Sequence, residues 1–190
     1  SAALQAISFD SRQGEPYMLL ATIYVTVDPY PEDPILNKTK YWVAVDKLQT
    51  AKSILAYSKR YLDLSGLRIA YGTDWFYSTS QKAIAVQRED YRDLKDENIW
   101  NRFMFTYLKE EFNYEIKQTI ECMDIFSLFH EVGHFLIGNI CTPYEYHVRM
   151  QDAETDEEYR KIPDEYEADK FAVEFLKEHM DELLELIESL

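Results

Sequence analysis

One five-residue segment in the second half of the chain has residue types and a spacing that could bind a metal ion. His130 and His134 flank Glu131 in the pattern His-Glu-x-x-His, which is typical of zinc peptidases. On an α-helix, residues four apart lie about 40° apart around the axis and one turn apart along it, so both imidazoles can reach one ion. A catalytic zinc site adds a third protein ligand and a position for water. The pattern therefore predicts one zinc ion (Zn²⁺) per chain.

Glu131 has a different role in this pattern because it lies about 100° around the helix from His130. Its carboxylate flanks the metal position and does not bind the ion. From there it can take a proton from zinc-bound water while the water attacks a carbonyl carbon. Glu131 is therefore the predicted catalytic base of a hydrolase.

The third ligand is expected from the acidic segment Asp164–Ala172. If this segment is a helix, Asp169 lies about 40° from Glu165 and Glu167 lies about 200° from it. Ala168 falls on the same face as Glu165 and leaves room for a close approach to the active-site helix. We predict Glu165 as the third zinc ligand. Asp169, one turn further, is expected to accept a hydrogen bond from the distal nitrogen of a ligand histidine and so to orient it.

A donor to the developing oxyanion is also needed, and the sequence leaves this residue open. His147 is one candidate for that donor or for a substitute ligand. His179 shares the face of Glu165 but lies more than three turns away, which favours a packing role. Four tyrosines are further candidates, and nothing in the sequence chooses among them: Tyr144, Tyr146, Tyr159 and Tyr166.

The pattern of apolar residues predicts which elements hold these side chains. A helix is expected over 119–137, ended by Gly138, and a last helix is expected from about Asp164, which could cap it, to the C-terminus. Residues 140–163 are expected to form an irregular polar connection. Another helix is expected from about residue 91, with one apolar stripe formed by Trp100, Phe103, Met104, Tyr107 and Leu108.

The first half of the chain has the composition of short strands around one helix. Strands are expected over 17–27, 41–45, 68–71, 75–77 and 82–87, and a helix over 48–64 that Gly66 ends. The strand 82–87 is the predicted edge along which an extended substrate aligns. The expected fold is a single α+β domain over 1–190. It has a strand-rich part with a small mixed or antiparallel sheet over 1–90 and a helical part with the active site over 91–190.

Composition limits the partners and the location of the protein. The net charge is −15, of which residues 151–190 carry −11, and such a surface repels nucleic-acid phosphates. The longest apolar run, Met18–Val27, is too short to cross a bilayer. Cys122 and Cys141 are expected to be reduced thiols, although one bridge between them stays open. No secretory signal pattern is present, so we expect a cytoplasmic protein that binds neither nucleic acid nor membrane, with its oligomeric state open.

Two motifs within Ile125–Leu176 resemble one known family. The segment Ile125–His134, I-F-S-L-F-H-E-V-G-H, is similar to the F-T-L-A-H-E-L-G-H signature of the ImmA/IrrE-type metallopeptidases. The segment Glu165–Ala172 resembles the E-x-x-A-N-x-F-A element of that family. The resemblance implies a zincin-like, gluzincin-type site in which His130, His134 and Glu165 bind zinc and Glu131 is the base. It also implies a repressor-like protein as the substrate.

The function expected from the sequence is that of a soluble zinc metalloprotease acting on a protein or peptide. The main alternative is a zinc-stabilised binding or regulatory protein that cuts no substrate. A latent protease, with Ser1–Asp46 as a flap over the cleft, is a further alternative, and so is a hydrolase of amides other than peptides.

Overall fold

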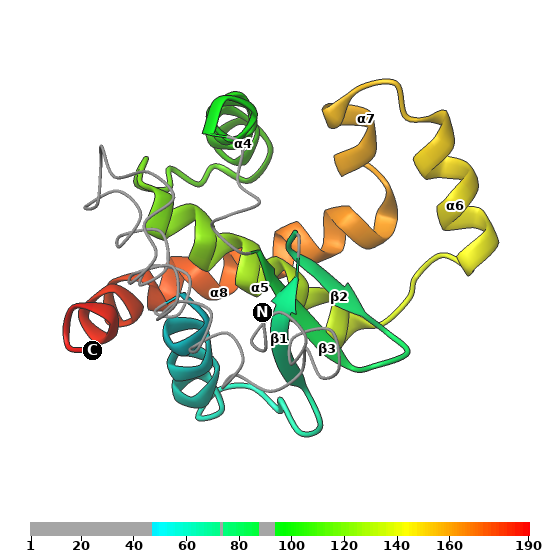
Figure 1. Ribbon diagram of the computed structural model, residues 1–190. Helices are drawn as coiled ribbons and strands as arrows, with labels where there is room; N and C mark the ends of the chain where they lie inside the picture. Colours follow the sequence, from blue (N-terminus) through cyan, green and yellow to red (C-terminus); the bar gives the residue numbers. More distant parts are fainter. Residues whose placement is uncertain (1–46, 73, 88–93) are drawn as a thin grey trace, which may run out of the picture.

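The computed structural model describes residues 47–72, 74–87 and 94–190, and helices predominate in it (Figure 1). Three short strands form one small sheet beside these helices. The described chain is therefore a mixed α+β arrangement, as predicted. The strands expected over 17–27 and 41–45, and the flap expected over 1–46, lie outside the described residues.

The sheet contains β1 (Arg68–Gly72), β2 (Phe76–Ser78) and β3 (Ala83–Gln87) in the order β1-β3-β2. β1 is parallel to β3, with Arg68 opposite Ala83, whereas β2 is antiparallel to it, with Phe76 opposite Ala85. The prediction that 82–87 forms an edge strand is wrong, because β3 lies between the other two. Its residues 83–86 are all buried, as expected for an apolar run covered on both faces. Among the described strands, the short strand β2 lies at one edge of the sheet.

Described residues 47–58 are helical and precede the sheet, and this helix ends before residue 64, where the predicted helix over 48–64 was expected to end. The chain tightens after Ser58, where the amide of Tyr61 donates to the Ser58 carbonyl at 2.9 Å. The Ser58 hydroxyl also donates to the carbonyl of Ile54, a local bond that often bends helices. Gly66 therefore does not end the helix. It lies in a later turn at φ +82°.

Two of the predicted helices are present close to their expected bounds. α4 (Leu94–Phe112) buries Met104, Tyr107 and Leu108 from the expected apolar stripe. α5 (Ile120–Ile137) begins after Thr119, whose side chain accepts a hydrogen bond from the amide of Cys122. α5 ends at Gly138, which has φ 74° and donates its amide to the carbonyl of His134.

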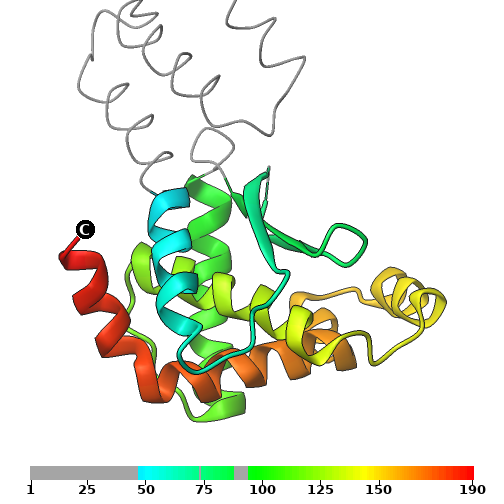
Figure 2. The same ribbon diagram turned by 90° about the horizontal axis from the view of Figure 1, so that it is seen from below.

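Residues 140–163 are largely helical, so the prediction of an irregular connection is wrong. α6 (Pro143–Asp152) begins with a capping box between Thr142 and Glu145. α7 (Asp156–Arg160) begins at Thr155, whose side chain accepts from the amide of Glu158. Both starts use a local pattern of a threonine followed three residues later by a glutamate. α6 lies beside α7, on the side of the described residues opposite the C-terminus (Figures 1 and 2).

α8 (Pro163–Glu188) is the last helix, and Asp164 does not cap it as predicted. The capping position is Ile162, which offers no side-chain acceptor, and Pro163 occupies the first turn. The Asp164 carboxylate accepts hydrogen bonds from the amides of Ile140 and Cys141, both at 3.0 Å. Asp164 therefore ties the start of α8 to the segment that follows α5.

The packing of α5 against α8 forms the centre of the described core. Gly133 lies against Ala168, so close that a Cβ atom on Gly133 would lie 2.9 Å from the Ala168 Cα atom. The rings of Phe129 and Phe175 stack at 4.5 Å between their centroids. Tyr77 of β2 packs edge-on against Phe135 of α5, which fixes the sheet beside this helix.

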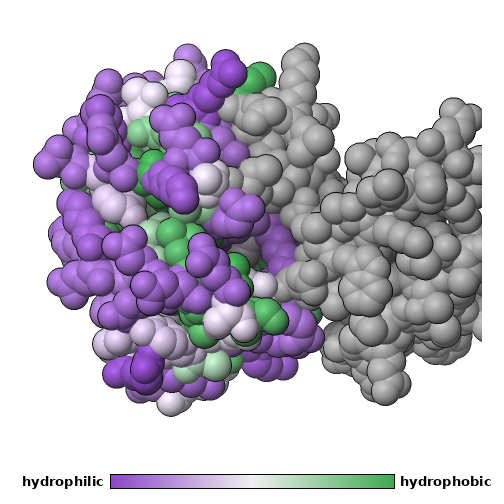
Figure 3. Space-filling view, turned by 90° about the vertical axis from the view of Figure 1, so that its left-hand side faces the viewer, coloured by the Kyte–Doolittle hydropathy of each residue, from purple (hydrophilic) through white to green (hydrophobic). Residues whose placement is uncertain are grey.

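The surface of the described residues is largely hydrophilic on the face that Figure 3 shows, where hydrophobic side chains form only small groups. Cys122 and Cys141 are both buried and free, which answers the question of a bridge between them. Among helices of the described part of the chain, none has the length and apolar character needed to cross a membrane.

Candidate metal centre

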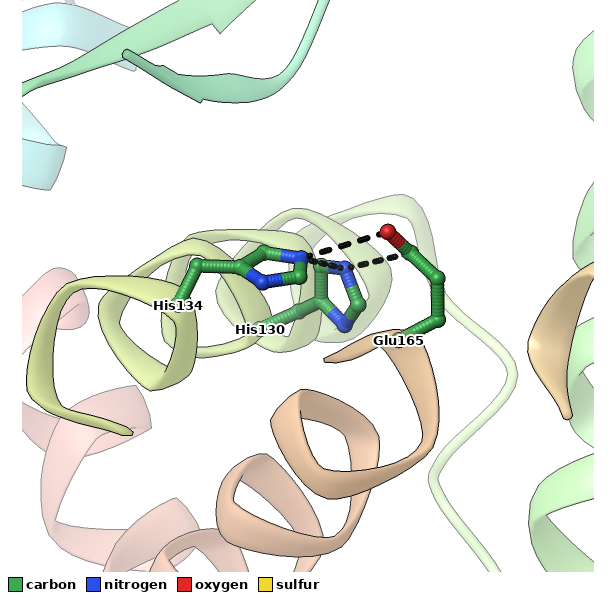
Figure 4. Close-up of side chains that lie close together, drawn as sticks. All are labelled: His130, His134 and Glu165. Atoms are coloured by element: carbon green, nitrogen blue, oxygen red, sulfur yellow. Dashed lines mark hydrogen bonds and ion pairs between the residues drawn. The ribbon is translucent and has the colours of Figure 1, made fainter. Parts of the chain in front are cut away.

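Two helices that are distant in sequence bring three donor side chains together (Figure 4). His130 and His134 project from α5, and Glu165 projects from the first turn of α8. The two Nε2 atoms are 3.1 Å apart, Glu165 Oε2 is 3.3 Å from His130 Nε2, and Glu165 Oε1 is 3.5 Å from His134 Nε2. The three predicted ligands therefore form one cluster that could hold a metal ion.

The size of this cluster fits a small tetrahedral ion. Metal–ligand bonds of 2.0–2.1 Å in a tetrahedron place the ligand atoms about 3.3–3.4 Å from one another. The two Nε2 atoms, 3.1 Å apart, lie close to this spacing, and each imidazole has a different Glu165 oxygen at 3.3 or 3.5 Å. Two imidazole nitrogens with one carboxylate oxygen are also a donor set that zinc accepts.

The charges of the cluster are coupled because its members are buried. His130 is 5% exposed and Glu165 is 3% exposed. Burial on its own lowers the pKa of His130, but the carboxylates of Asp169 and Glu165 outweigh it and raise that pKa to about 10. Burial on its own raises the pKa of Glu165, but its contacts with the two histidines hold that pKa well below its usual range. The site thus favours an ionised Glu165 carboxylate next to a positive charge, either a protonated His130 or a bound cation.

Asp169 makes the contact predicted for it. His130 Nδ1 lies 2.8 Å from Asp169 Oδ1, and the aspartate is fully buried. A carboxylate at Nδ1 favours the tautomer whose Nε2 lone pair is free for a metal ion. Asp169 therefore turns the correct nitrogen of His130 toward His134 and Glu165.

Glu131 lies beside the cluster in the wall of a cavity of about 1060 Å³. The carboxyl group is buried, and burial raises its pKa above the usual range, while the two imidazoles act in the opposite direction. A carboxyl group at this position is a candidate to accept and return a proton. The predicted position of Glu131, flanking the cluster, is present in the structure.

The cavity is bounded by the sheet edge, by α4 and α5, and by the segment that contains α6 and α7. Its wall includes Phe76 from β2, Trp100 from α4 and Pro143 from α6. β2 has a strand neighbour on one side only among the described strands. The same cavity therefore contains the cluster of His130, His134 and Glu165 and a strand edge that could pair with an extended peptide.

The candidate oxyanion donors on α6, α7 and α8 separate into two groups. Tyr146 donates from its hydroxyl to Glu165 Oε1 at 2.7 Å, and its oxygen is 3.3 Å from the Tyr159 hydroxyl. Both tyrosines line the cavity, but His147 is exposed on α6 and lies outside the described residues that line it. Tyr144 is 77% exposed, and the Tyr166 hydroxyl donates to Glu111. Tyr146 is thus the candidate donor that the structure brings to the cluster.

Arg160 is a residue of the site that the sequence analysis missed. It ends α7 and is only 8% exposed, and its Nη1 atom lies 3.1 Å from Asp169 Oδ1 and 3.6 Å from Glu165 Oε2. An arginine within an acidic polar segment is most often exposed. No local pattern marked this one, because its partners come from α8 and its position depends on the tertiary fold.

His179 has the packing role that its distance from Glu165 suggested. Its ring lies 4.2 Å from the ring of Tyr61 and 4.5 Å from that of Phe175, measured between centroids. Glu165 and the candidate metal centre lie toward the other end of α8.

Comparison of the chain with protein-family models, with curated proteins and with solved structures finds no match. The interpretation of the site therefore depends on the geometry and chemistry of its own residues.

Proposed function

We propose that this chain is a zinc-dependent metallopeptidase that hydrolyses peptide bonds in a protein substrate. One observation carries the proposal: three donor atoms of His130, His134 and Glu165 converge beside the Glu131 carboxylate in the wall of one cavity. A site that only stabilises the fold by binding zinc is usually closed by four protein ligands, whereas a catalytic site keeps one position open. Three ligands next to a cavity and a carboxylate favour the catalytic interpretation.

Zinc is the proposed cofactor because two imidazoles and a carboxylate at these separations suit a tetrahedral divalent ion. When bound, such an ion supplies Lewis acidity and activates a water molecule near neutral pH. The side chains perform the other steps. Asp169 holds His130 in the ligand tautomer, Glu131 takes a proton from the attacking water and returns it to the leaving amine, and Tyr146 donates to the developing oxyanion.

A protein or peptide substrate is supported by the shape of the site. The cavity of about 1060 Å³ is large for a single small ligand. It borders β2, whose free edge can bind an extended chain by backbone hydrogen bonds. The resemblance to the ImmA/IrrE-type metallopeptidases supports a zincin-like fold and a repressor-like protein as the substrate. We accordingly place the reaction in the cytoplasm and in a regulatory role.

The test is the variant Glu131→Gln, which removes the base but leaves the three ligands in place. We expect it to bind one zinc ion per chain, as the unmodified protein does, and to lose at least about 10²-fold in peptide cleavage. Glu121→Gln, on an exposed position of the same helix, is the matched control and is expected to cleave normally.

Two results would contradict the proposal. A fully active Glu131→Gln variant would exclude the assigned base. Unmodified protein that binds zinc with full occupancy but cuts no member of a diverse peptide library would instead favour a non-catalytic, zinc-stabilised binding or regulatory protein.

A further inference from the structure

We propose that Arg160 is a positioning residue of the metal centre: its guanidinium holds the ligand Glu165 and the orienting residue Asp169 in their metal-binding arrangement. The inference rests on the proposed metal site and extends it to α7, an element outside both ligand-bearing helices. Arg160 touches neither the reacting atoms nor a proposed ligand nitrogen, so its effect must pass through the two carboxylates.

The contacts of Arg160 are those of a residue fixed in place. One nitrogen, Nη1, lies 3.1 Å from Asp169 Oδ1 and 3.6 Å from Glu165 Oε2. On the other side, the centre of the guanidinium lies 4.8 Å from the centroid of the Trp100 ring, within the range of a cation–π contact. The side chain is thus held between α4 and α8, and it cannot leave the carboxylates without exposing them.

Asp169 Oδ1 has two partners, because it also lies 2.8 Å from His130 Nδ1. Arg160 and His130 therefore meet at the same carboxylate oxygen. Glu165 is held in a similar way, with Tyr146 at Oε1 and Arg160 near Oε2. Each of the two carboxylates is oriented by a group that is not itself a proposed ligand.

Charge explains how a buried cation is tolerated so near a metal position. Arg160 and the two carboxylates that it contacts, those of Glu165 and Asp169, are all buried. When these three groups are ionised they leave one negative charge, which favours a cation at the metal position. A buried set of ions is stable only if its members are paired.

Charge and positioning predict opposite effects for the loss of Arg160. If the arginine acted only by its charge, its removal would strengthen zinc binding, because one repulsive cation would be gone. If it acts by holding Asp169 and Glu165, its removal weakens zinc binding, typically by about 10–100-fold for a group that orients metal ligands. We expect the second result.

The experiment compares Arg160→Met, Arg160→Lys and Lys161→Met with the unmodified full chain. Lys161 is the neighbouring cation and is exposed, where it pairs with Glu157, so Lys161→Met is the matched control. Zinc dissociation constants are measured by competition with a coloured chelator, and the visible absorption spectrum of the Co²⁺-loaded protein reports the ligand geometry. Neither readout requires catalytic activity.

Arg160→Met is expected to bind zinc about 10–100-fold more weakly and to change the Co²⁺ spectrum. Arg160→Lys is expected to lie between it and the unmodified protein, because an ammonium keeps the charge but lacks the planar fork. Lys161→Met should match the unmodified protein. If Arg160→Met does not fold, which a melting curve reveals, Arg160→Lys decides: weaker binding supports the proposal, and unchanged binding and spectrum overturn it.

Unchanged or tighter zinc binding by folded Arg160→Met overturns the inference. The proposed peptidase activity is tested separately. If the unmodified protein binds zinc but cuts no peptide, the enzymatic proposal fails. If the Arg160→Met variant of that protein still binds zinc more weakly, the inference about Arg160 holds.

Discussion

Three side chains outside the proposed ligand set hold the atoms of the candidate metal centre. Asp169 contacts Nδ1 of His130, while Tyr146 and Arg160 approach the two oxygens of Glu165. Such partners fix ligand orientation before a metal ion arrives, which reduces the reorganisation needed for binding. They also make the behaviour of single variants predictable.

Tyr146→Phe is the most informative variant among the tyrosines. The hydroxyl of Tyr146 is the candidate oxyanion donor, and burial followed by the nearby Glu165 carboxylate raises its pKa above the usual range, so it keeps its proton. We expect kcat for peptide cleavage at saturating zinc to fall about 10²–10³-fold, as for loss of one oxyanion donor, with KM little changed. Zinc binding is expected to weaken as well, because the same hydroxyl holds Glu165 Oε1. Tyr144→Phe, on a largely exposed tyrosine of the same helix, is the control. Equal activity of both variants would remove Tyr146 from the mechanism.

The sequence predicted those residues of the site that lie on the same two helices. Spacing alone places His130 and His134 on one face of α5, and Glu165 and Asp169 on one face of α8, because the period of a helix is fixed. Tyr146 could not be separated from three other tyrosines, and Arg160 was missed. Their positions depend on how α6 and α7 turn back toward α8, and this cannot be derived from the spacing of residues along the sequence.

At the scale of elements, the metal centre depends on how closely α5 approaches α8. Gly133 permits this approach, because an added Cβ atom would lie 2.9 Å from the Cα atom and 3.0 Å from the carbonyl oxygen of Ala168. Both neighbouring atoms belong to the backbone and cannot rotate away. Gly133 and Ala168, of which the sequence analysis noted the second, therefore set the distance between α5 and α8.

Gly133→Ala tests this crossing. Helix propensity alone would make alanine more stable than glycine by about 1 kcal/mol, whereas overpacking a tight contact costs about 1–3 kcal/mol. We expect overpacking to win, so that the free energy of unfolding falls by up to about 2 kcal/mol and zinc binding weakens. Chemical denaturation and zinc titration measure the two effects.

The double variant Gly133→Ala with Ala168→Gly provides a control on the cause. It removes the Ala168 Cβ atom, which lies 3.3 Å from the added carbon, but leaves the closer backbone atoms in place. We expect no rescue. Recovery of stability in the double variant, or a single variant more stable than the unmodified protein, would show that the backbone contact does not limit the crossing.

The predicted helices match the structure where apolar residues recur at helical spacing over several turns. The prediction failed where a helix depends only on a short local pattern at its start. α5 and α8 were located because their buried faces span several turns. α6 and α7 were missed, although the pairs Thr142–Glu145 and Thr155–Glu158 have the spacing of helix starts. α6 has no buried residue, so it lacks the apolar stripe from which the other helices were predicted.

At the scale of the whole molecule, the arrangement of the sheet and the cavity could not be predicted from the sequence. The order β1-β3-β2 combines a parallel and an antiparallel neighbour for β3. The apolar run of β3 suggests a strand but does not say which strands flank it. The cavity arises only when β2, α4, α5 and the α6–α7 segment are brought together.

Only the folded structure shows which acidic residues near the end of the chain are buried and which are exposed. Most of the negative charge falls in residues 151–190, and α8 divides its acidic residues between two environments. Glu165 and Asp169 are buried at the metal centre, whereas Glu174 and Glu178 are exposed on the opposite face. The total charge alone does not distinguish a ligand from a solvated surface residue.

The central claim is that two distant helices of one chain bind a single zinc ion, and the zinc content of the purified protein tests it most directly. The measurement is elemental analysis after metal removal, reloading and dialysis, for the unmodified chain, for Glu165→Ala and for Glu174→Ala. We predict one zinc ion per chain in the unmodified protein and in Glu174→Ala, and loss of tightly bound zinc in folded Glu165→Ala. A Glu165→Ala variant that retains one zinc ion as tightly as the unmodified protein, or an unmodified protein that binds none, would contradict the account.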